Sequence, residues 1–391
     1  MRILLYAPNY LPATRYGGPI RSSHGLAKAL VGLGHEVQVF TTNVDGYGVL
    51  DVPLDSDAEI DGVRVRYFPV RRPRRIYFSP AMGRALEGEI GGFDVAHVNG
   101  VYLWPGPKLA REAAKAGVPL IVSPRGMLSP EMIAGKSRLV KTAWIGLLER
   151  RVLAGAAAIH VTSDEEAGGV RRLGLGLAPV AVIGNGVELP ERPPSEVEVE
   201  RFWAGVPRGA RVAVLGRLDW TKGVDLAIDA VAAQGDAQVL IAGPDQIGLR
   251  AGLEPRLLRA ADRSCGRFVG ELQGSDKWAL LLGADVLLAP SVKESFGMSV
   301  AEALAVGTPV ICSEGVGAAS IVRRLDPELV VVRTAAALAT ALHALLADAQ
   351  RRERIGRQAR DIMADEFSLS AVAQQMLDLY ARAISRKERG A

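Results

Sequence analysis

The chain of 391 residues is long enough for two domains, and its content of 49% hydrophobic and 23% charged residues fits an ordinary globular protein with an ample core. A net charge of +4, with no basic stripe interleaved with aromatic residues, argues against a nucleic-acid binder. No apolar run approaches the roughly 18 residues that span a bilayer, and the presence of only two cysteines favours a reducing cytoplasm.

The positive charge is concentrated in the first half, where residues 1–190 have 22 Lys and Arg against 17 Asp and Glu. Residues 191–391 have 25 against 26. Part of the excess is the run Arg71-Arg72-Pro73-Arg74-Arg75, and further cations follow at Arg125, Lys136, Arg138 and Lys141. Such a cluster is either a solvated loop or a surface that faces anionic lipid or a pyrophosphate-linked acceptor.

The chain is expected to begin with a buried strand over residues 2–7, ended by Pro8, rather than with a secretory leader. A helix follows over residues 20–33, with Gly17 and Gly18 directly before it. Glycines there let a phosphate approach the backbone, but a plain turn into the helix explains them equally well. A nicotinamide site is not expected, because there is no Gly-x-Gly-x-x-Gly and the next strand ends in threonines.

The pair Asp55 and Asp57 has the Asp-x-Asp spacing of a metal site, but it does not follow a buried strand. It lies in a Pro- and Asp-rich loop before Ile60-Asp-Gly-Val63, which is typical of a hairpin turn. A solvated loop is therefore the preferred interpretation, and no metal site is predicted here.

Polar residues stand at the ends of two further strands expected in the first half. The strand over residues 93–98 carries His97 and is followed by Asn99, and His97 is either a ligand contact or a satisfied buried histidine. A strand over residues 120–123 leads to Arg125, which at the carboxyl end of an open α/β sheet would point toward a ligand crevice. Arg125 could bind a phosphate or a carboxylate of an acceptor, or form a salt bridge within the loop.

A helix is expected over residues 136–153, with Val140, Trp144, Leu147 and Leu148 on one face. Packing of this face against its own domain is favoured over contact with a membrane. The Pro- and Glu-rich segment 188–206 is interpreted as a linker, after which strands and helices alternate again. The pattern predicts two parallel sheets covered by helices, followed by a helical tail over residues 370–386.

The most informative segment runs from Ser291 to Ile311, between two expected buried strands. Glu294 stands in the loop after the first strand, and Glu302 lies more than one turn into a helix that starts near Gly297. The helix start offers free backbone N–H groups at Gly297, Met298 and Ser299, which favour an anion. Carboxylates on both sides of an anion site suit a nucleotide sugar, although glutamates at a helix start often serve only the helix dipole.

Two cations occupy the loop after the strand over residues 211–215. Arg217 follows this strand directly and Lys222 precedes the next helix, so the two could clamp one diphosphate without a metal. The alternative is an exposed pair in a loop.

The segment Glu294-Ser-Phe-Gly-Met-Ser-Val-Ala-Glu302, continued to Ile311, resembles the paired-glutamate signature of retaining glycosyltransferases of family four, which have the GT-B fold. The segment from Gly216 to Ala230 resembles the phosphate-binding segment of that family, and Ile183-Gly-Asn-Gly-Val187 resembles its interdomain turn. The string Ser-Pro-Arg125-Gly-Met-Leu resembles a subgroup that makes bacterial surface polysaccharides.

The resemblance implies an α/β protein of two Rossmann-like domains that face a central cleft. The expected domains are an acceptor domain over residues 1–189, a donor domain over residues 190–368, and a C-terminal helix over residues 369–391 that crosses back to the first domain.

The resemblance also implies which residues form the site. Those expected in catalysis are Glu294, Arg217, Lys222 and His97. Those expected to bind the donor are Gly17, Gly18, Phe296, Gly297, Met298, Ser299, Glu302, Gly270 and Leu272, with Lys277 near the base. Those expected at the acceptor or cleft are Asn99, Arg125 and Asn185.

One position departs from the family pattern. The family often has histidines at alternate positions of the strand that carries His97, and here the second is Asn99. Asparagine can hydrogen-bond but cannot exchange a proton, so the part that His97 or Asn99 takes in catalysis stays open.

The expected activity is transfer of a sugar, with retention and without a metal or other cofactor, from a UDP- or GDP-sugar to a glycan or a polyprenyl-pyrophosphate-linked acceptor. The expected setting is polysaccharide or cell-envelope glycan synthesis in the cytoplasm, with peripheral contact at the inner face of the membrane as an option. Nucleic-acid partners are not expected. The alternatives are a glycoside phosphorylase, a nucleotide-sugar epimerase of the same fold, or a catalytically inactive scaffold that binds nucleotide sugars.

Overall fold

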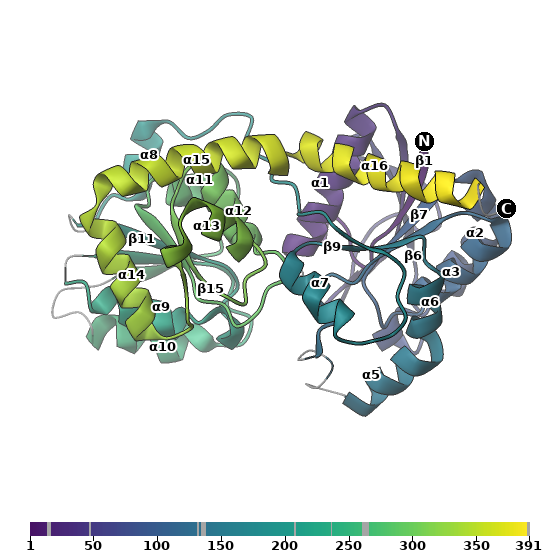
Figure 1. The fold of residues 1–391 in the computed structure, drawn as a ribbon, viewed down its shortest axis with the longest axis horizontal. Helices are drawn as coiled ribbons and strands as arrows, with labels where there is room; N and C mark the ends of the chain where they lie inside the picture. The colour runs from purple at the N-terminus through teal and green to yellow at the C-terminus, as the bar shows by residue number, and fades with distance from the viewer. Residues whose placement is uncertain are drawn as a thin grey trace. The chain divides into compact units, whose positions relative to one another are not determined.

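In a computed structural model the chain is described over residues 1–13, 17–46, 48–130, 133, 138–206, 209–235, 237–259 and 266–388. It divides into two compact units, the first made of Met1–Gly186 and Phe367–Ala391 and the second of Val187–Glu366 (Figure 1). The sequence placed the corresponding boundaries after residues 189 and 368. Lys136, singled out above for its charge, lies outside the described residues.

The first unit is built on an eight-stranded sheet with the strand order β10-β9-β8-β7-β1-β2-β6-β5. The strands are β1 Arg2–Tyr6, β2 Glu36–Thr42, β5 Asp57–Ile60, β6 Val63–Phe68, β7 Val95–Asn99, β8 Leu120–Ser123, β9 Ala158–Val161 and β10 Val180–Val182. The strands from β10 to β6 are parallel, and β5 is an antiparallel edge strand. The strand order reverses between β1 and β7, which is where open α/β sheets bind ligands, beyond the carboxyl ends of the strands.

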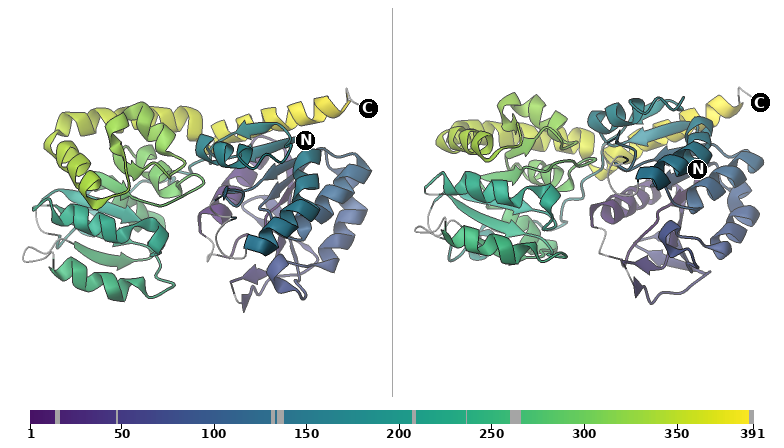
Figure 2. Two further views of the ribbon diagram at one scale, coloured as in Figure 1. Left: turned by 60° about the horizontal axis from the view of Figure 1, so that its bottom comes forward. Right: turned by 90° about the horizontal axis from the view of Figure 1, so that it is seen from below.

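Alternate residues of the central strand enter two separate cores on the two faces of this sheet. Leu4 and Tyr6 of β1 pack in one core, and Ile3 and Leu5 pack in the other. Helices cover both faces, as the turned views of Figure 2 show. They are α1 Gly18–Gly32, α2 Pro80–Glu89, α3 Pro105–Ala116, α5 Arg138–Trp144, α6 Arg150–Gly155, α7 Asp164–Arg171 and α16 Leu369–Glu388.

Helix α16 closes the first unit although it comes from the end of the chain. It contacts α1 and strands β7 and β8, and its buried side chains Val372, Met376 and Tyr380 belong to the core beneath α1. Gly25 of α1 lies directly against Leu369, so the two helices approach closely. The C-terminal helix thus packs on the N-terminal sheet.

Of the Asp-x-Asp pair, Asp57 is the first residue of the edge strand β5 and so does not lie in a solvated loop as expected, whereas Asp55 lies in the segment before that strand. Strands β5 and β6 pair with Ile60 opposite Val63, and both turn residues, Asp61 and Gly62, have positive φ, as the hairpin interpretation expected. Asp57 accepts a hydrogen bond of 2.6 Å from Arg66 Nε. That bond is the main reason why the pKa of Asp57 is lowered.

The helix expected over residues 136–153 differs from the prediction in its course and in its contacts. Helix α5 passes into one π-helical segment, Ile145–Glu149, before α6 begins. The extra residue in a π turn rotates the faces of the helix, so that Ile145 and Glu149 point inward. Val140 and Leu147 are 68% and 69% exposed, so the expectation that they pack against the domain is wrong.

The second unit has a six-stranded parallel sheet with the order β13-β12-β11-β14-β15-β16. The strands are β11 Arg211–Leu215, β12 Gln238–Ala242, β13 Gly266–Gly270, β14 Val286–Ala289, β15 Val310–Ser313 and β16 Val330–Val331. The helices are α8 Glu196–Phe202, α9 Val224–Ala232, α10 Leu249–Arg259, α11 Gly274–Leu282, α12 Met298–Ala305, α13 Ala319–Leu325, α14 Ala335–Ala347 and α15 Ala349–Phe367. Here the strand order reverses between β11 and β14.

Together the two units confirm the predicted fold class of two Rossmann-like domains. Among the described residues, no helix is both long enough and apolar enough to cross a membrane.

Candidate active site

In the second unit, the loops that follow β11 and β14 meet at the carboxyl edge of the sheet. The backbone N–H of Val292 donates to the carbonyl of Thr221 over 2.6 Å, which joins the two loops directly. Arg217 and Lys222 belong to the first loop and Glu294 to the second. The pair of cations and the glutamate, which the sequence singled out in two separate segments, therefore lie where the strand order reverses.

Lys222 and Glu294 form an ion pair in which Nζ lies 2.9 Å from Oε2. The other carboxylate oxygen of Glu294 accepts a hydrogen bond of 2.6 Å from the hydroxyl of Ser291, whose side chain is buried. The exposed fractions are 21% for the Lys222 side chain and 15% for that of Glu294, so both can still reach a ligand. Arg217 is exposed and has no hydrogen-bonded partner within the described part of the chain.

Helix α12 begins four residues after Glu294, and its N-cap is a glycine whose conformation requires that residue type. Gly297 is the N-cap, its φ is 100°, and a Cβ there would lie 2.8 Å from Cγ1 of Val316. Among the described residues, the backbone amides of Gly297, Met298 and Ser299 have no hydrogen-bond acceptor. With the helix dipole, these amides form a site for an anionic oxygen.

The second glutamate is held by a different lysine. Glu302 Oε1 lies 2.9 Å from Nζ of Lys277, whose side chain is mostly buried. The same Nζ lies 4.2 Å from the centre of the Trp278 ring. Lys277 comes from α11, so the pair joins α11 to α12. The exposed fraction of Glu302 is 15%, which leaves its second oxygen able to accept from ligand hydroxyls.

Gly270 is the last residue of β13, and Leu272 follows it at the same edge. The carbonyl of Gly270 accepts a hydrogen bond of 2.7 Å from Gly243, and Gly243 in turn lies against Gly216 so closely that a Cβ would overlap its carbonyl oxygen. This chain of backbone contacts draws the ends of β11, β12 and β13 together. The predicted donor-binding residues of the second unit therefore share one edge of one sheet.

In the first unit, Arg125 is held by two asparagines at the carboxyl edge. Its Nε donates to Asn99 Oδ1 and its Nη1 to Asn185 Oδ1, both over 2.7 Å. Asn99 also donates to the carbonyl of Tyr6 over 3.1 Å, which ties it to the end of β1. The φ of Arg125 is 54°, an unfavourable conformation for a non-glycine residue. The three residues that the sequence assigned to the acceptor side thus form one cluster.

His97 lies beneath this cluster and does not reach the surface. Its side chain is 0% exposed, and its ring nitrogens are hydrogen-bonded to the hydroxyls of Tyr380 over 2.7 Å and Ser123 over 2.6 Å. The hydroxyl of Ser123 is also hydrogen-bonded to Nδ1 of His160, and Nε2 of His160 is hydrogen-bonded to the carbonyl oxygen of Ile183. Burial lowers the pKa of His97 far below its ordinary value, with further contributions from His160 and Arg125. These contacts favour the alternative of a satisfied buried histidine.

The Gly17-Gly18 pair lies at the start of α1, after β1. Gly17 is the N-cap with a φ of 58° and no neighbouring atom near the position of a Cβ. The backbone is therefore open at this helix start, and among the described residues no hydrogen bond joins Gly17 or Gly18 to Arg125 or Asn99.

Comparison with known proteins identifies the family. A glycosyl transferase 4-like domain matches residues 17–186, and the model of glycosyl transferases group 1 matches residues 204–362. A D-inositol 3-phosphate glycosyltransferase from Saccharomonospora viridis is 31% identical over 325 residues, covering 76% of this chain and 72% of that protein. The chain belongs to the glycosyl transferases group 1 family.

The likeness extends over the whole length of this glycosyltransferase. A glycogen synthase from Mycobacterium tuberculosis is 29% identical over an alignment of 419 residues, which covers 98% of this chain and 95% of that protein. The crystal structure of HepE from Anabaena, in complex with UDP and glucose, superimposes with a TM-score of 0.75 at 19% identity, covering 97% of this chain and 99% of the other. At that identity the likeness concerns the fold, and it confirms the GT-B fold expected from the sequence.

The roles of two residues that organise the glycosyltransferase site were not found from its sequence. Ser291 orients Glu294, and Ser123 links two buried histidines. Lys277 was expected near the base, but its ion pair with Glu302 was not. Ser123 and His160 did carry a signal, because each is a polar residue inside an otherwise apolar buried strand. The pairing of Lys222 with Glu294 and of Lys277 with Glu302 carried no signal, since it depends on how the loop after β11 and helix α11 are placed.

Proposed function

We propose that this glycosyltransferase moves a sugar from a nucleoside diphosphate sugar, a UDP- or GDP-sugar, to a glycan or a lipid-linked acceptor, with retention of anomeric configuration and without a metal. The role fits polysaccharide or cell-envelope glycan synthesis in the cytoplasm, with peripheral contact at the inner face of the membrane. The observation that carries the proposal is the Lys222–Glu294 ion pair beside the unpaired amides of α12.

The donor-binding part of the proposal follows from charge. A diphosphate needs fixed positive groups. Arg217 supplies a guanidinium that can donate two hydrogen bonds, Lys222 supplies a compact ammonium charge, and the amides of Gly297 to Ser299 supply the positive end of a helix. Glu302 would bind the ribose hydroxyls and Glu294 the hydroxyls of the sugar. The complex of the Anabaena protein with UDP and glucose supports a donor of this kind.

The proposed reaction uses the leaving phosphate as the base. The bond from the anomeric carbon to the diphosphate oxygen breaks, and the acceptor oxygen bonds the same carbon from the same face. The acceptor proton passes to the leaving phosphate oxygen, so atoms and charges balance without a protein nucleophile. Lys222, Arg217 and the α12 amides would stabilise the charge that builds on the diphosphate, an effect worth about 10²–10³ in turnover for a single lost donor.

The acceptor is proposed to meet the first unit at the Asn99–Arg125–Asn185 cluster. Arg125 holds a cationic, partly desolvated guanidinium there, and its two hydrogen-bonded partners are neutral amides. A phosphate or carboxylate of the acceptor would complement that charge. His97 is assigned a positioning role, because it supports the strand beneath Asn99 through Tyr380 and Ser123.

The donor is tested by thermal denaturation of the full chain with UDP, GDP and ADP. A diphosphate at one hundred times its dissociation constant should stabilise the folded state by about 2.7 kcal/mol. If none of the three raises the melting temperature, the donor proposal is wrong.

The mechanism is tested with the donor so identified. Its sugar is transferred in the presence of EDTA, and the anomeric configuration of the product is read by NMR. An inverted product would exclude the front-face reaction, and full loss of activity in EDTA that is restored by Mg²⁺ would exclude the metal-free part.

A further inference from the structure

The first unit carries an apolar surface on a helix that leaves the body of the domain. Leu139 and Val140 of α5 and Leu147 and Leu148 of the π-helical segment are 84%, 68%, 69% and 38% exposed. We call these four residues the apolar stripe. In Figure 1, α5 lies at the outer edge of its unit. Four large aliphatic side chains exposed within ten residues form a patch of the kind that marks an interaction site.

The exposure of the stripe is a consequence of how the helix is anchored. Glu149 is 2% exposed, and its Oε1 accepts hydrogen bonds from the backbone of Tyr102 over 2.7 Å and from Trp144 Nε1 over 2.9 Å. Together with buried Ile145, Glu149 fixes which face of the π-helical segment points inward. The stripe is therefore held outward by specific contacts.

Beside the stripe lies a groove of about 770 Å³, within the size range of pockets that bind apolar ligands. Leu147 and Leu148 line it together with Val118, Leu120 and Val152. Leu120 is the first residue of β8, so the groove opens at the amino ends of the strands. The Asn99–Arg125–Asn185 cluster is at the carboxyl ends, and the groove is therefore a separate site.

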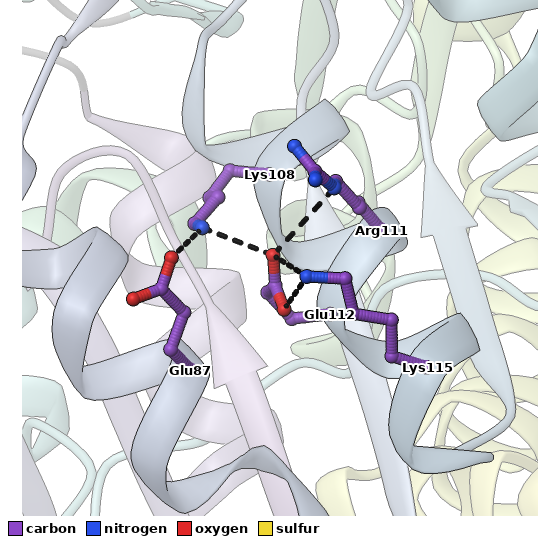
Figure 3. Close-up of polar contacts among 5 residues, drawn as sticks. All are labelled: Glu87, Lys108, Arg111, Glu112 and Lys115. Atoms are coloured by element: carbon purple, nitrogen blue, oxygen red, sulfur yellow. Dashed lines mark hydrogen bonds and ion pairs between the residues drawn. The ribbon is translucent and has the colours of Figure 1, made fainter.

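All charged residues that line the groove are cations. They are Arg111, Arg151, Arg386 and Lys387. Among the side chains that the structure describes, no carboxylate pairs with the last three. Arg111 is different, because its Nε lies 3.9 Å from Oε1 of Glu112, which also binds Lys108 and Lys115 (Figure 3). An adjoining hollow of about 180 Å³ shares Arg386 and adds Arg382, so the positive rim continues along α16.

We propose that the apolar stripe and this groove dock the protein on a bilayer that contains anionic phospholipid. Apolar side chains enter the acyl boundary of such a bilayer, and each basic residue near its surface adds electrostatic attraction to the phosphates. The unpaired cations beside exposed leucines match this combination of an apolar layer and an anionic surface.

A second copy of the chain fits the surface less well. A two-fold symmetric contact would place the cation-lined surface of one copy against the same surface of the other, with no carboxylate among the groove-lining residues to compensate. The charge thus favours an anionic partner, and the extended aliphatic stripe favours a lipid layer.

This inference extends the proposed function, because docking on a bilayer would bring the protein to the membrane that holds a lipid-linked acceptor. It does not depend on catalysis, because binding to vesicles is measured without donor or acceptor. Donor binding can therefore fail while vesicle binding succeeds, and the reverse also holds.

The test is co-sedimentation of the full chain with vesicles of phosphatidylcholine alone and of phosphatidylcholine with about 30% phosphatidylglycerol, which gives the vesicle surface a negative potential. We expect partition into the anionic vesicles only, and its loss in about 0.5 M NaCl through screening. Leu147→Asp and the double variant Arg151→Glu, Arg386→Glu should each reduce partition at least tenfold.

Matched controls come from the second unit. Val197 of α8 is 67% exposed, and Arg201 of α8 and Arg354 of α15 are exposed. The variant Val197→Asp and the double variant Arg201→Glu, Arg354→Glu therefore make the same changes outside the surface. Both should bind vesicles as the wild type does, and circular dichroism checks that all variants fold. Equal binding to both vesicle types, or wild-type binding by Leu147→Asp, would overturn the proposal. A dimer in solution that Leu147→Asp dissociates would assign the surface to a second copy instead.

Discussion

The ammonium group of Lys222 lies 2.9 Å from the carboxylate of Glu294, across the point where the strand order of the second sheet reverses. The two side chains are only 21% and 15% exposed, so each depends on the charge of the other to compensate for its lost hydration. Lysine has three donor hydrogens, so Lys222 can bind Glu294 and a phosphate oxygen together. The pair can therefore organise a ligand while it stays paired.

Lys222→Ala should lower turnover by about 10²–10³ and also lower the melting temperature of the free protein. The lost charge no longer stabilises the departing diphosphate, and the mostly buried Glu294 is left without its counter-charge. Steady-state kinetics and thermal denaturation measure the two effects. Arg250→Ala is the control, because it breaks an exposed ion pair with Glu254 in the same unit and should affect neither quantity. A variant Lys222→Ala with wild-type turnover would remove Lys222 from the mechanism.

Arg125→Lys should reduce transfer to the acceptor without weakening binding of the nucleoside diphosphate. Lysine cannot reproduce the fork that holds Asn99 and Asn185 at the same time, so an order of magnitude or more in transfer rate is expected to be lost. Isothermal titration with the diphosphate and the rate of transfer separate the two functions. Loss of diphosphate affinity in this variant would contradict the assignment of Arg125 to the acceptor.

Much of the fold and part of the site were predictable from the sequence, and the reasons differ between residues. The apolar runs of β11 and β14 are short and bounded by turn residues, so the strands and the loops with Arg217 and Glu294 could be located from local pattern alone. The pairing of Lys222 with Glu294 needs the order of the strands in the sheet, which no local pattern encodes. The outward face of Leu147 was mispredicted because a π turn looks like ordinary helix in a sequence.

The buried His97–Ser123–His160 network predicts a loss of stability in weak acid. Burial, with a smaller contribution from Arg125, lowers the pKa of His160 from 6.5 to about 3. Between these two values the unfolded chain binds a proton that the folded chain does not, so the free energy of unfolding falls as the pH falls through this window. One pH unit below 6.5, this residue alone costs about 1.4 kcal/mol.

His160→Gln should flatten that dependence. The difference in unfolding free energy between pH 7 and pH 5.5 should shrink by about 1 kcal/mol, measured by urea unfolding at both values. His343→Gln serves as the control, since His343 is exposed on α14 and should leave the dependence unchanged. An unaltered pH dependence in His160→Gln would show that His160 is not the residue responsible.

Gly297→Ala should impair diphosphate binding through the backbone. A left-handed conformation costs an L-residue roughly 1–2 kcal/mol, and the new Cβ would also press on Val316 at 2.8 Å. The helix start would have to shift, which moves the amides of Met298 and Ser299 away from the position that an anionic oxygen needs. We expect at least a tenfold weaker affinity for the diphosphate in isothermal titration, together with a lower melting temperature.

Gly252→Ala in α10 is the matched control. Gly252 has open space at the Cβ position and ordinary helical backbone, so the substitution should leave the stability unchanged or raise it by up to about 1 kcal/mol. If Gly297→Ala binds the diphosphate as tightly as Gly252→Ala does, the amide-rich start of α12 is not the anion site.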